Sequence, residues 1–166
     1  MENREHGGVY FAAMNTADGF KSFFPEIFGS LSRLFIIKGG PGTGKSRLMR
    51  EFSARAKEKG YASEEFLCSS DPTSLDGVIV PELSIGMIDG TAPHTYDPSI
   101  PGAKENLVDL GQFWDSGALK ESVSEIGEIN QSKSRLYGSV YSYMNAVRGY
   151  DKTISEMVGQ ALDPEK

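Results

Sequence analysis

Cysteine and long apolar runs are the features that this sequence has least of. Its only cysteine, Cys68, has no partner for an internal disulfide. No apolar run approaches the roughly 20 residues that a membrane-spanning helix needs. The first residues, 1–6, are polar and hold no signal-peptide core. These absences predict a cytoplasmic protein with no membrane association.

Positive charge is also in short supply. The chain carries 17 Lys and Arg against 23 Asp and Glu, a formal net charge of −6. Nucleic-acid-binding proteins need clustered positive charge to neutralise phosphates, so this balance argues against an extended nucleic-acid interface. The 166 residues, 39% hydrophobic and 24% charged, have the size and composition of one globular domain.

One glycine-rich stretch dominates the sequence. It follows the apolar run 34–37 and precedes a segment with helical periodicity, and it reads Gly39-Gly40-Pro41-Gly42-Thr43-Gly44-Lys45-Ser46. This is the P-loop pattern G-x-x-x-x-G-K-[ST], between a strand and a helix as the pattern requires. Glycines let the backbone wrap closely around an anion. The successive amide groups and the start of the helix then favour phosphate oxygens.

The end of the motif assigns further roles. Lys45 is expected to reach the β- and γ-phosphates of a nucleotide, and the Ser46 hydroxyl is expected to bind Mg²⁺. Arg47 follows directly and lies near enough to the phosphates to be a binding candidate. The sequence has no evident N-K-x-D motif for guanine, so we expect ATP with Mg²⁺ as the cofactors.

Three residues outside the motif are candidates for the same site. Asp89 ends an apolar segment downstream of the motif, the arrangement in which a carboxylate holds Mg²⁺. Asp71 follows an apolar segment and could contact metal, water or substrate, or form an Asx turn or helix cap. His94 lies in a proline-rich loop and could orient water near the γ-phosphate, or be a structural hydrogen-bonding residue.

The order of the expected elements predicts an α/β fold. Short apolar runs predict strands, and apolar residues spaced three and four apart predict helices. The expected strands are 9–13, 33–38, 61–68 and 83–90. The expected helices are 19–24, 44–59 and 118–162, with a short helix or turn at 107–114. Gly127, Gly138 and Gly149 interrupt the pattern of the last segment, so it is expected to form one long bent helix or a pair of helices.

Combined with the glycine-rich motif, these elements predict a P-loop NTPase three-layer sandwich with a mainly parallel sheet and a C-terminal helical region. Because the expected strands are few, the sheet is expected to be small or incomplete. Residues 1–115 are predicted to form the nucleotide-binding core, and residues 116–166 a helical extension or lid.

Several segments resemble an uncharacterised bacterial family of P-loop proteins known only as ATP-binding or nucleotide-kinase-like, with two tandem P-loop halves joined by a helical region. The resemblance is to the first half and covers nearly the whole chain. Besides the glycine-rich motif, the matching segments are 10–12, 15–16, 19–20, 68–71, 74–77, 81–83, 89–94, 97–102 and 113–114. The resemblance implies ATP binding and names no substrate. The chain stops without a second P-loop, as expected of a truncated or half-length version.

Three functions are compatible with these features. The first is a Mg²⁺-dependent ATPase in which Asp71 or His94 positions water. The second is a small-molecule or nucleotide kinase in which Asp71 activates an acceptor; the lack of a Glu after Asp89 favours it, and the lack of an arginine-rich lid argues against it. The third is a nucleotide-gated interaction module, or one half of a larger assembly that needs a protein partner or second P-loop half.

Overall fold

The computed structural model describes residues 7–93 and 95–162, which form two compact units. The first unit holds the described residues up to 14 together with residues 22–115. The second holds residues 15–21 and those from 116 onward. Among the described residues, no helix combines the length and the apolar character needed to cross a bilayer.

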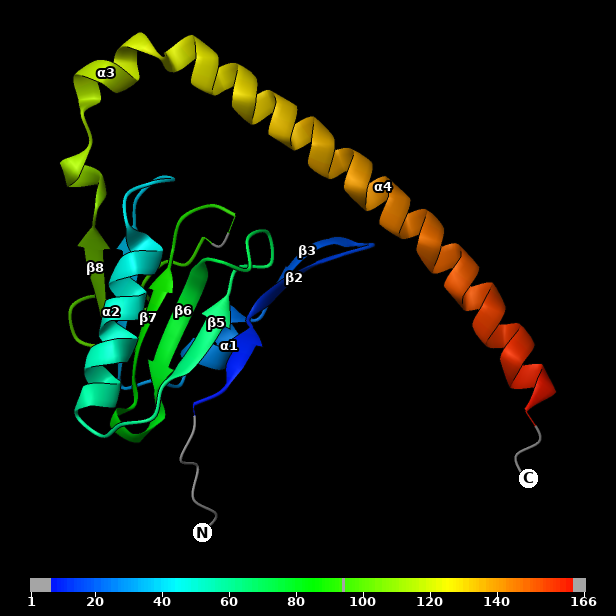
Figure 1. Cartoon of the computed structure of the whole chain (residues 1–166), viewed down its shortest axis with the longest axis horizontal. Helices are drawn as coiled ribbons and strands as arrows, with labels where there is room; N and C mark the ends of the chain where they lie inside the picture. Colours follow the sequence, from blue (N-terminus) through cyan, green and yellow to red (C-terminus); the bar gives the residue numbers. More distant parts are fainter. Residues whose placement is uncertain (1–6, 94, 163–166) are drawn as a thin grey trace. The chain divides into compact units, whose positions relative to one another are not determined.

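The first unit is built on a six-stranded sheet in the order β1-β5-β6-β7-β4-β8 (Figure 1). The strands are β1 (Val9–Phe11), β4 (Arg33–Lys38), β5 (Glu64–Leu67), β6 (Leu75–Val80), β7 (Ile85–Asp89) and β8 (Glu105–Asp109). The pairs β1–β5, β7–β4 and β4–β8 are parallel. In the centre of the sheet, β6 runs antiparallel to both of its neighbours, β5 and β7.

The predicted three-layer P-loop sandwich with a mainly parallel sheet is therefore wrong. The sheet is mixed, with its antiparallel pairs in the centre. Its α-helices in the described residues are α1 (Phe24–Phe28) and α2 (Lys45–Glu58), so the sheet lacks a full helical layer on each face.

Connection length explains the reversal of β6. Residues 68–74 are all that separates β5 from β6, and residues 81–84 are all that separates β6 from β7. A parallel crossover needs a dozen or more residues, whereas an antiparallel return needs only a turn. The segment 78–80, predicted only as an apolar patch cut by Pro81, is the second half of β6, in which all six residues are buried. The first half of β6 holds Asp76 and Gly77, which interrupt the apolar run, so the sequence pattern did not mark the whole strand.

Helix α2 covers one face of the sheet and α1 lies on the other side (Figure 1). The core under α2 is a cluster of five buried residues, listed here: Ile37, Met49, Leu75, Val78 and Met87. The helix ends as predicted, with Gly60 at φ +84° just past its last turn. The apolar stripe of α2 thus fixes the position of its first turn, where the glycine-rich loop enters.

The opposite face is closed by aromatic packing. Phe24 and Phe28 of α1 are fully buried, and the Phe28 ring meets Phe66 of β5 edge-to-face at 5.1 Å between centroids. Gly77 of β6 faces Phe28, where an added Cβ would come within 2.6 Å of the ring. A larger residue at position 77 would therefore displace α1 from the sheet.

One local prediction near the N-terminus is wrong. Segment 19–24 was predicted to be helical, but Gly19–Ser22 forms strand β3, paired with β2 (Ala13–Thr16) in a hairpin. The turn needs Gly19 at φ +99°, a conformation that only glycine adopts without strain. Helix α1 begins later, with Pro25 in its first turn, where the missing N–H costs nothing.

The second unit is mainly helical. It contains α3 (Ser116–Glu121) and α4 (Val123–Ala161), a continuous helix of 39 residues. The predicted interruptions at Gly127, Gly138 and Gly149 do not break α4. Within this unit, Tyr141 donates a hydrogen bond to Asn15 and Arg148 pairs with Asp18, both of the hairpin.

Candidate functional site

The glycine-rich loop lies at the C-terminal end of β4, between that strand and α2. Because β4 and β7 are parallel, with Ile37 in register with Asp89, the end of β7 lies beside the start of the loop. The register therefore brings Asp89 to the same edge of the sheet as Gly39 and Lys45, as the sequence predicts for these residues.

The loop backbone depends on glycine at two places. Gly42 has φ +78° and Gly44, the residue that caps α2, has φ +88°, both in the left-handed region. An added Cβ at either residue would meet no atom within 4 Å, so backbone conformation rather than space requires glycine there. Between them, the Thr43 hydroxyl donates to the carbonyl of Gly40 at 2.9 Å, which braces the turn.

The Lys45 ammonium folds back over the loop. It donates to the carbonyl oxygens of Gly39 at 2.6 Å and Gly40 at 2.9 Å. It also lies 3.5 Å from Oδ2 of Asp89. The Lys45 and Asp89 side chains are 13% and 15% exposed, so water screens this pair less than a surface ion pair. Lys45 thus places a positive charge against the backbone of the loop.

Thr91 links the end of β7 to the loop, a role that the sequence analysis missed. Its N–H donates to Oδ1 of Asp89 at 2.8 Å, which fixes the carboxylate. Its hydroxyl donates to the carbonyl of Gly39 at 2.9 Å and accepts from the Gly39 N–H at 3.2 Å. A threonine two residues after a strand-ending aspartate was the available signal, because Asp side chains commonly bond the backbone two residues on.

Ser46 lies in the first turn of α2 and faces β6. Its hydroxyl oxygen accepts a hydrogen bond from the Leu75 N–H at 2.9 Å. This contact uses one lone pair and leaves the other for a second partner. Ser46 and Asp89 offer the hard oxygen ligands that Mg²⁺ prefers, so the residues of this edge fit that ion.

Metal binding by protein groups alone has little support. In residues 7–93 and 95–162, no three His, Cys, Asp or Glu side chains gather as a set that could hold a metal ion. A magnesium ion at Ser46 and Asp89 would have to take its remaining ligands from water and phosphate oxygens. That is the usual way in which Mg²⁺ binds beside nucleotides.

Lys38 organises the loop that follows β7. Its ammonium donates to the carbonyls of Gly90 at 2.7 Å and Tyr96 at 3.1 Å, and lies 3.4 Å from Asp97. This cation, unmarked in the sequence analysis, ties the start and the middle of the segment between β7 and β8 to β4. His94, predicted to sense the γ-phosphate, lies outside the described residues.

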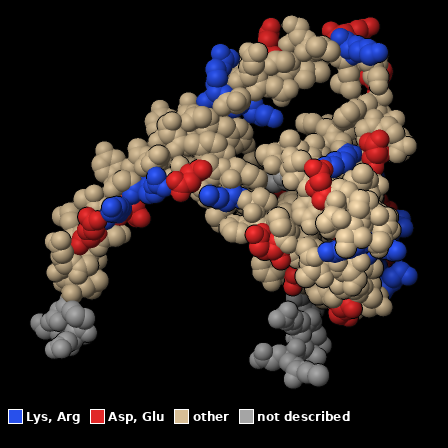
Figure 2. Space-filling view, turned by 180° about the vertical axis from the view of Figure 1, so that it is seen from behind, with Lys and Arg blue, Asp and Glu red and all other residues tan. Residues whose placement is uncertain are grey.

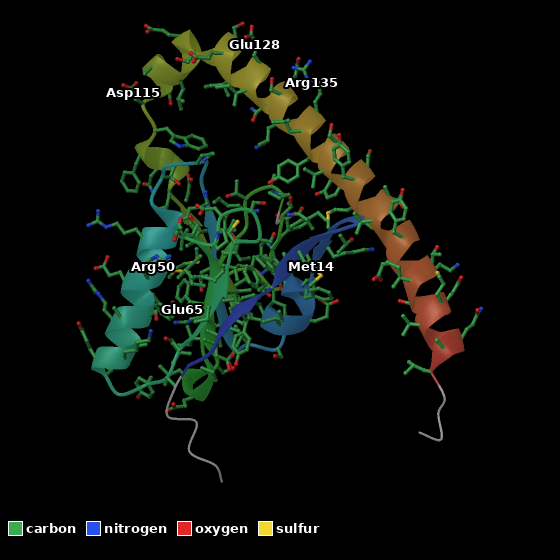
Figure 3. All side chains as sticks on the ribbon, turned by 45° about the vertical axis from the view of Figure 1, so that its right-hand side comes forward. Met14, Arg50, Glu65, Asp115, Glu128 and Arg135 are labelled. Atoms are coloured by element: carbon green, nitrogen blue, oxygen red, sulfur yellow. The ribbon has the colours of Figure 1, made fainter. Side chains whose placement is uncertain are left out.

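Asp71 is engaged in a local turn. Its Oδ1 accepts hydrogen bonds from the Thr73 N–H and hydroxyl, at 3.1 and 2.6 Å, and its Oδ2 accepts from the Ser74 hydroxyl at 2.7 Å. The Thr73 and Ser74 bonds hold the pKa of the Asp71 carboxyl below its usual value. Arg50 of α2, labelled in Figure 3, donates to the Thr73 carbonyl and adds positive charge nearby. These bonds match the Asx-turn alternative, and a catalytic role for Asp71 stays a prediction.

Two further residues complete the surroundings of the loop. Arg47 is exposed on the first turn of α2. The indole of Trp114 lies over Gly40, where an added Cβ would come within 3.0 Å of the ring. Trp114 remains 47% exposed, so one side of the indole stays accessible. Sequence analysis gave Trp114 no role, because nothing in its local pattern connects it with a loop more than 70 residues away.

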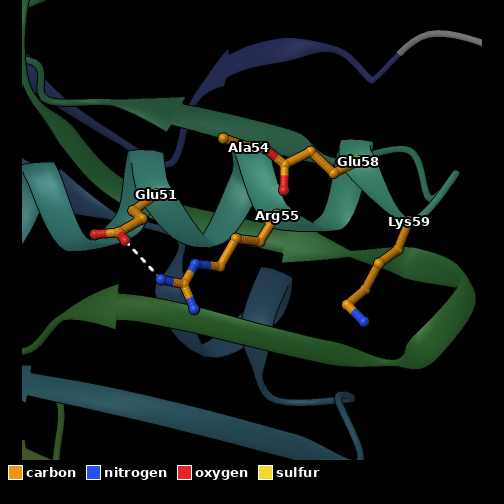
Figure 4. A pocket seen from close by; sticks show the side chains of 5 residues that line it. All are labelled: Glu51, Ala54, Arg55, Glu58 and Lys59. Atoms are coloured by element: carbon orange, nitrogen blue, oxygen red, sulfur yellow. Dashed lines mark hydrogen bonds and ion pairs between the residues drawn. The ribbon is translucent and has the colours of Figure 1, made fainter.

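A surface depression in this unit lies away from the glycine-rich loop. It is formed by side chains of one helix, the C-terminal half of α2: Glu51, Ala54, Arg55, Glu58 and Lys59 (Figure 4). The Glu51–Arg55 ion pair, at 2.8 Å, crosses it. All five residues lie beyond the turn that carries Lys45 and Ser46, so this depression is separate from the glycine-rich loop.

Comparisons with protein-family models, with curated proteins and with solved structures found no match. The site is therefore interpreted from its own residues and geometry.

Proposed function

We propose that this chain binds ATP together with Mg²⁺ in the loop Gly39–Ser46 and hydrolyses it slowly. The observation that carries the proposal is the Lys45 ammonium, held between two loop carbonyls and the Asp89 carboxylate at the end of parallel strands. Such a lysine can exchange backbone carbonyls for phosphate oxygens without moving its Cα. Charge-assisted hydrogen bonds are worth about 1.5–3 kcal/mol each.

The loop backbone supplies the rest of the phosphate site. Gly42 and Gly44, both with positive φ, leave open space where side chains would otherwise stand. A phosphate there would accept hydrogen bonds from loop amides and from the first turn of α2, whose partial positive charge favours anions. This geometry concerns the loop alone and does not depend on the direction of β6.

Magnesium would be held by Ser46 and Asp89. When bound, the ion would neutralise part of the charge on the phosphates. Asp89 is already oriented for this role, since Thr91 fixes one of its oxygens and leaves Oδ2 toward Lys45. Ser46 would keep its bond from Leu75 while it offers its second lone pair to the ion.

Slow hydrolysis is expected because no general base is apparent among the described residues, which do not include His94. Both carboxylate oxygens of Asp71 accept local hydrogen bonds, and the carboxylate of Asp89 faces Lys45. Hydrolysis of a bound triphosphate depends mainly on positioning and charge neutralisation, so Lys45 and a metal at Asp89 can support a low rate. No contact among the described residues specifically favours a kinase.

Isothermal titration calorimetry with ATP and Mg²⁺ tests the proposal. Wild-type protein is expected to bind ATP, and Lys45→Ala is expected to lower the affinity by about 10–100-fold, the equivalent of one charge-assisted hydrogen bond. Lys59→Ala removes the same charge from the exposed C-terminal cap of the same helix and is the matched control. It should bind ATP as the wild type does.

The same samples test hydrolysis. Release of inorganic phosphate should fall to background in Lys45→Ala and persist in Lys59→Ala. Failure of the folded wild-type protein to bind either ATP or GTP in the presence of Mg²⁺ would overturn the proposal. Binding without phosphate release would retain the nucleotide site and remove the hydrolase activity.

A further inference from the structure

Helix α4 repeats apolar residues with alternating spacings of three and four, the heptad pattern of coiled coils. Two positions of the heptad form one stripe, here called the seam. Its first position holds Ile126, Lys133, Val140, Val147, Ile154 and Ala161. Its second position holds Ile129, Leu136, Tyr143, Tyr150 and Met157. The pattern runs through the whole helix without a skip, and Lys133 is its only charged member.

The seam is fully open to solvent. No residue of α4 is buried, and the large apolar residues of the seam are at least 38% exposed, with Tyr143 at 75% and Tyr150 at 73%. Helices in proteins draw most of their stability from packing an apolar face rather than from intrinsic propensity. A helix of 39 residues with no buried side chain therefore lacks the packing that its own sequence is patterned for.

Several residues outside the seam are those of an outer face. Gly127, Gly138, Gly149 and Gly159 all lie off the seam, and an added Cβ at each would meet open space. The hairpin contacts Tyr141 and Arg148, which also lie off the seam. Large parts of α4 carry no charged side chain in the view of Figure 2. The hairpin thus leaves the seam uncovered.

The choice of seam residues favours a particular partner. The first position is dominated by β-branched Ile and Val, and the second contains no valine and only one β-branched residue, Ile129. β-Branched residues at the first position with unbranched ones at the second favour two parallel strands. A single Lys at the first position, here Lys133, sets register and strand number at some cost in stability. In a parallel, in-register pair of identical helices, each residue type meets itself at the same level.

We propose that the seam of α4 pairs with the same seam of a second copy of this chain to form a parallel, in-register, two-stranded coiled coil. The helix is about 58 Å long at 1.5 Å per residue, which gives five heptads of contact. An aromatic side chain buries about 150–250 Å², so Tyr143 and Tyr150 of two chains would remove about 600 Å² from water. The aliphatic seam residues bring the interface past about 1,200 Å², the size of stable interfaces.

Sedimentation equilibrium of the full chain from about 1 to 100 µM tests the proposal. The expected mass at the upper end is twice the chain mass of 18.1 kDa. Val140→Lys/Val147→Lys puts two more charges in the seam and should raise the dimer dissociation constant at least 100-fold. Ser134→Lys/Ser155→Lys adds the same charge on the exposed outer face and should leave the constant within about threefold of wild type.

Lys133→Leu provides a test in the opposite direction. Removing the only charge in the seam should tighten the association at least tenfold, an effect that unfolding of the variant could not mimic. A wild-type chain that is monomeric at every concentration would overturn the proposal and assign the seam to a different helix. An equal rise in the dimer dissociation constant for the Val140→Lys/Val147→Lys and Ser134→Lys/Ser155→Lys variants would also overturn it.

Disulfide trapping tests the parallel orientation. In a Cys68→Ser background, Met157→Cys places a single thiol near one end of α4. The thiols of two chains come close enough for a disulfide only when the two helices run parallel and in register. After mild oxidation, Met157→Cys chains should run as covalent dimers under denaturing conditions. Ser155→Cys chains, which carry the thiol on the outer face, should run as monomers. A dimer by mass with no Met157→Cys link would refute the parallel arrangement.

Discussion

The Lys45 ammonium at the start of α2 and the Asp89 carboxylate at the end of β7 lie 3.5 Å apart. Neither side chain is more than 15% exposed, and each also has backbone partners. The two groups neutralise each other, and a bound nucleotide with its metal would separate them, with Lys45 on phosphate and Asp89 on the ion. Under the proposed function, this relationship would make the binding of magnesium and the binding of nucleotide depend on each other.

The first prediction concerns that dependence. Asp89→Asn keeps an oxygen for the Thr91 N–H but removes the charge that a magnesium ion needs. ATP affinity measured with Mg²⁺ is expected to fall about 10–100-fold, and affinity measured with EDTA to stay the same or rise, because Lys45 loses a competitor. Asp97→Asn is the control, because it removes the charge of an exposed aspartate that pairs with Lys38. It should leave the ATP affinity unchanged both with Mg²⁺ and with EDTA. An equal loss with and without Mg²⁺ would speak against Asp89 as a metal ligand.

The second prediction uses Trp114, the only tryptophan of the chain. Its indole lies against Gly40 and is 47% exposed, so a change in the loop alters the surroundings of the ring. Titration with ATP and Mg²⁺ should shift the tryptophan emission of the wild-type protein in a saturable way. Lys45→Ala should need more ATP for the same shift in emission, in proportion to its lower ATP affinity. Emission that stays constant while calorimetry reports binding would show that the loop does not move against Trp114.

The third prediction separates backbone strain from phosphate binding. Gly44→Ala and Gly60→Ala both place a Cβ in open space at positive φ, +88° and +84°. The left-handed conformation costs an L-residue about 1–2 kcal/mol, so each variant should lose about that much free energy of unfolding in urea. Only Gly44→Ala should also weaken ATP binding, since Gly60 lies at the other end of α2. A loss of ATP affinity in both variants would point to a global rather than a local effect.

The sequence predicted the neighbourhood of the loop more accurately than the sheet around it. The expected strand 33–38, the helix over 44–59 and the strand ending at Asp89 all correspond to elements β4, α2 and β7. Each of these has a local cause: a continuous apolar run, a 3.6-residue stripe, or a glycine at a cap. Roles that depend on contacts across the fold, such as those of Lys38 and Trp114, had no local signal strong enough to reveal them.

The sheet was mispredicted because its order and direction are non-local. The short connections around β6, residues 68–74 and 81–84, were visible in the sequence and could have indicated antiparallel neighbours. The second half of strand β8, residues 107–109, was predicted as part of a short helix or turn at 107–114, and its Asp109 has low strand propensity. Pairing with β4 overrides that preference.

The last prediction concerns acid stability and Glu105, the buried residue that begins β8. The Glu105 side chain is fully buried, and its carboxylate accepts hydrogen bonds from the Ile100 N–H at 2.8 Å and the Ser99 hydroxyl at 2.9 Å, with Lys104 at 3.8 Å. Burial alone would raise the pKa of Glu105. The bonds from Ile100 and Ser99, with the charge of Lys104, outweigh it and hold the pKa below its ordinary value of 4.5.

A lowered pKa means that the folded state binds this proton less tightly than the unfolded chain does. The contribution of Glu105 to the free energy of unfolding is therefore complete above about pH 4.5 and is lost as the pH falls toward the folded-state pKa. Glu105→Gln should lower stability at pH 7 and flatten the decline of stability below pH 4.5, measured by urea denaturation at each pH. Some decline should persist, because a hydrogen bond from Ser53 lowers the pKa of Glu65 as well. Glu51→Gln, which removes an exposed carboxylate from α2, is the control, and a flattening of equal size there would contradict the assignment to Glu105.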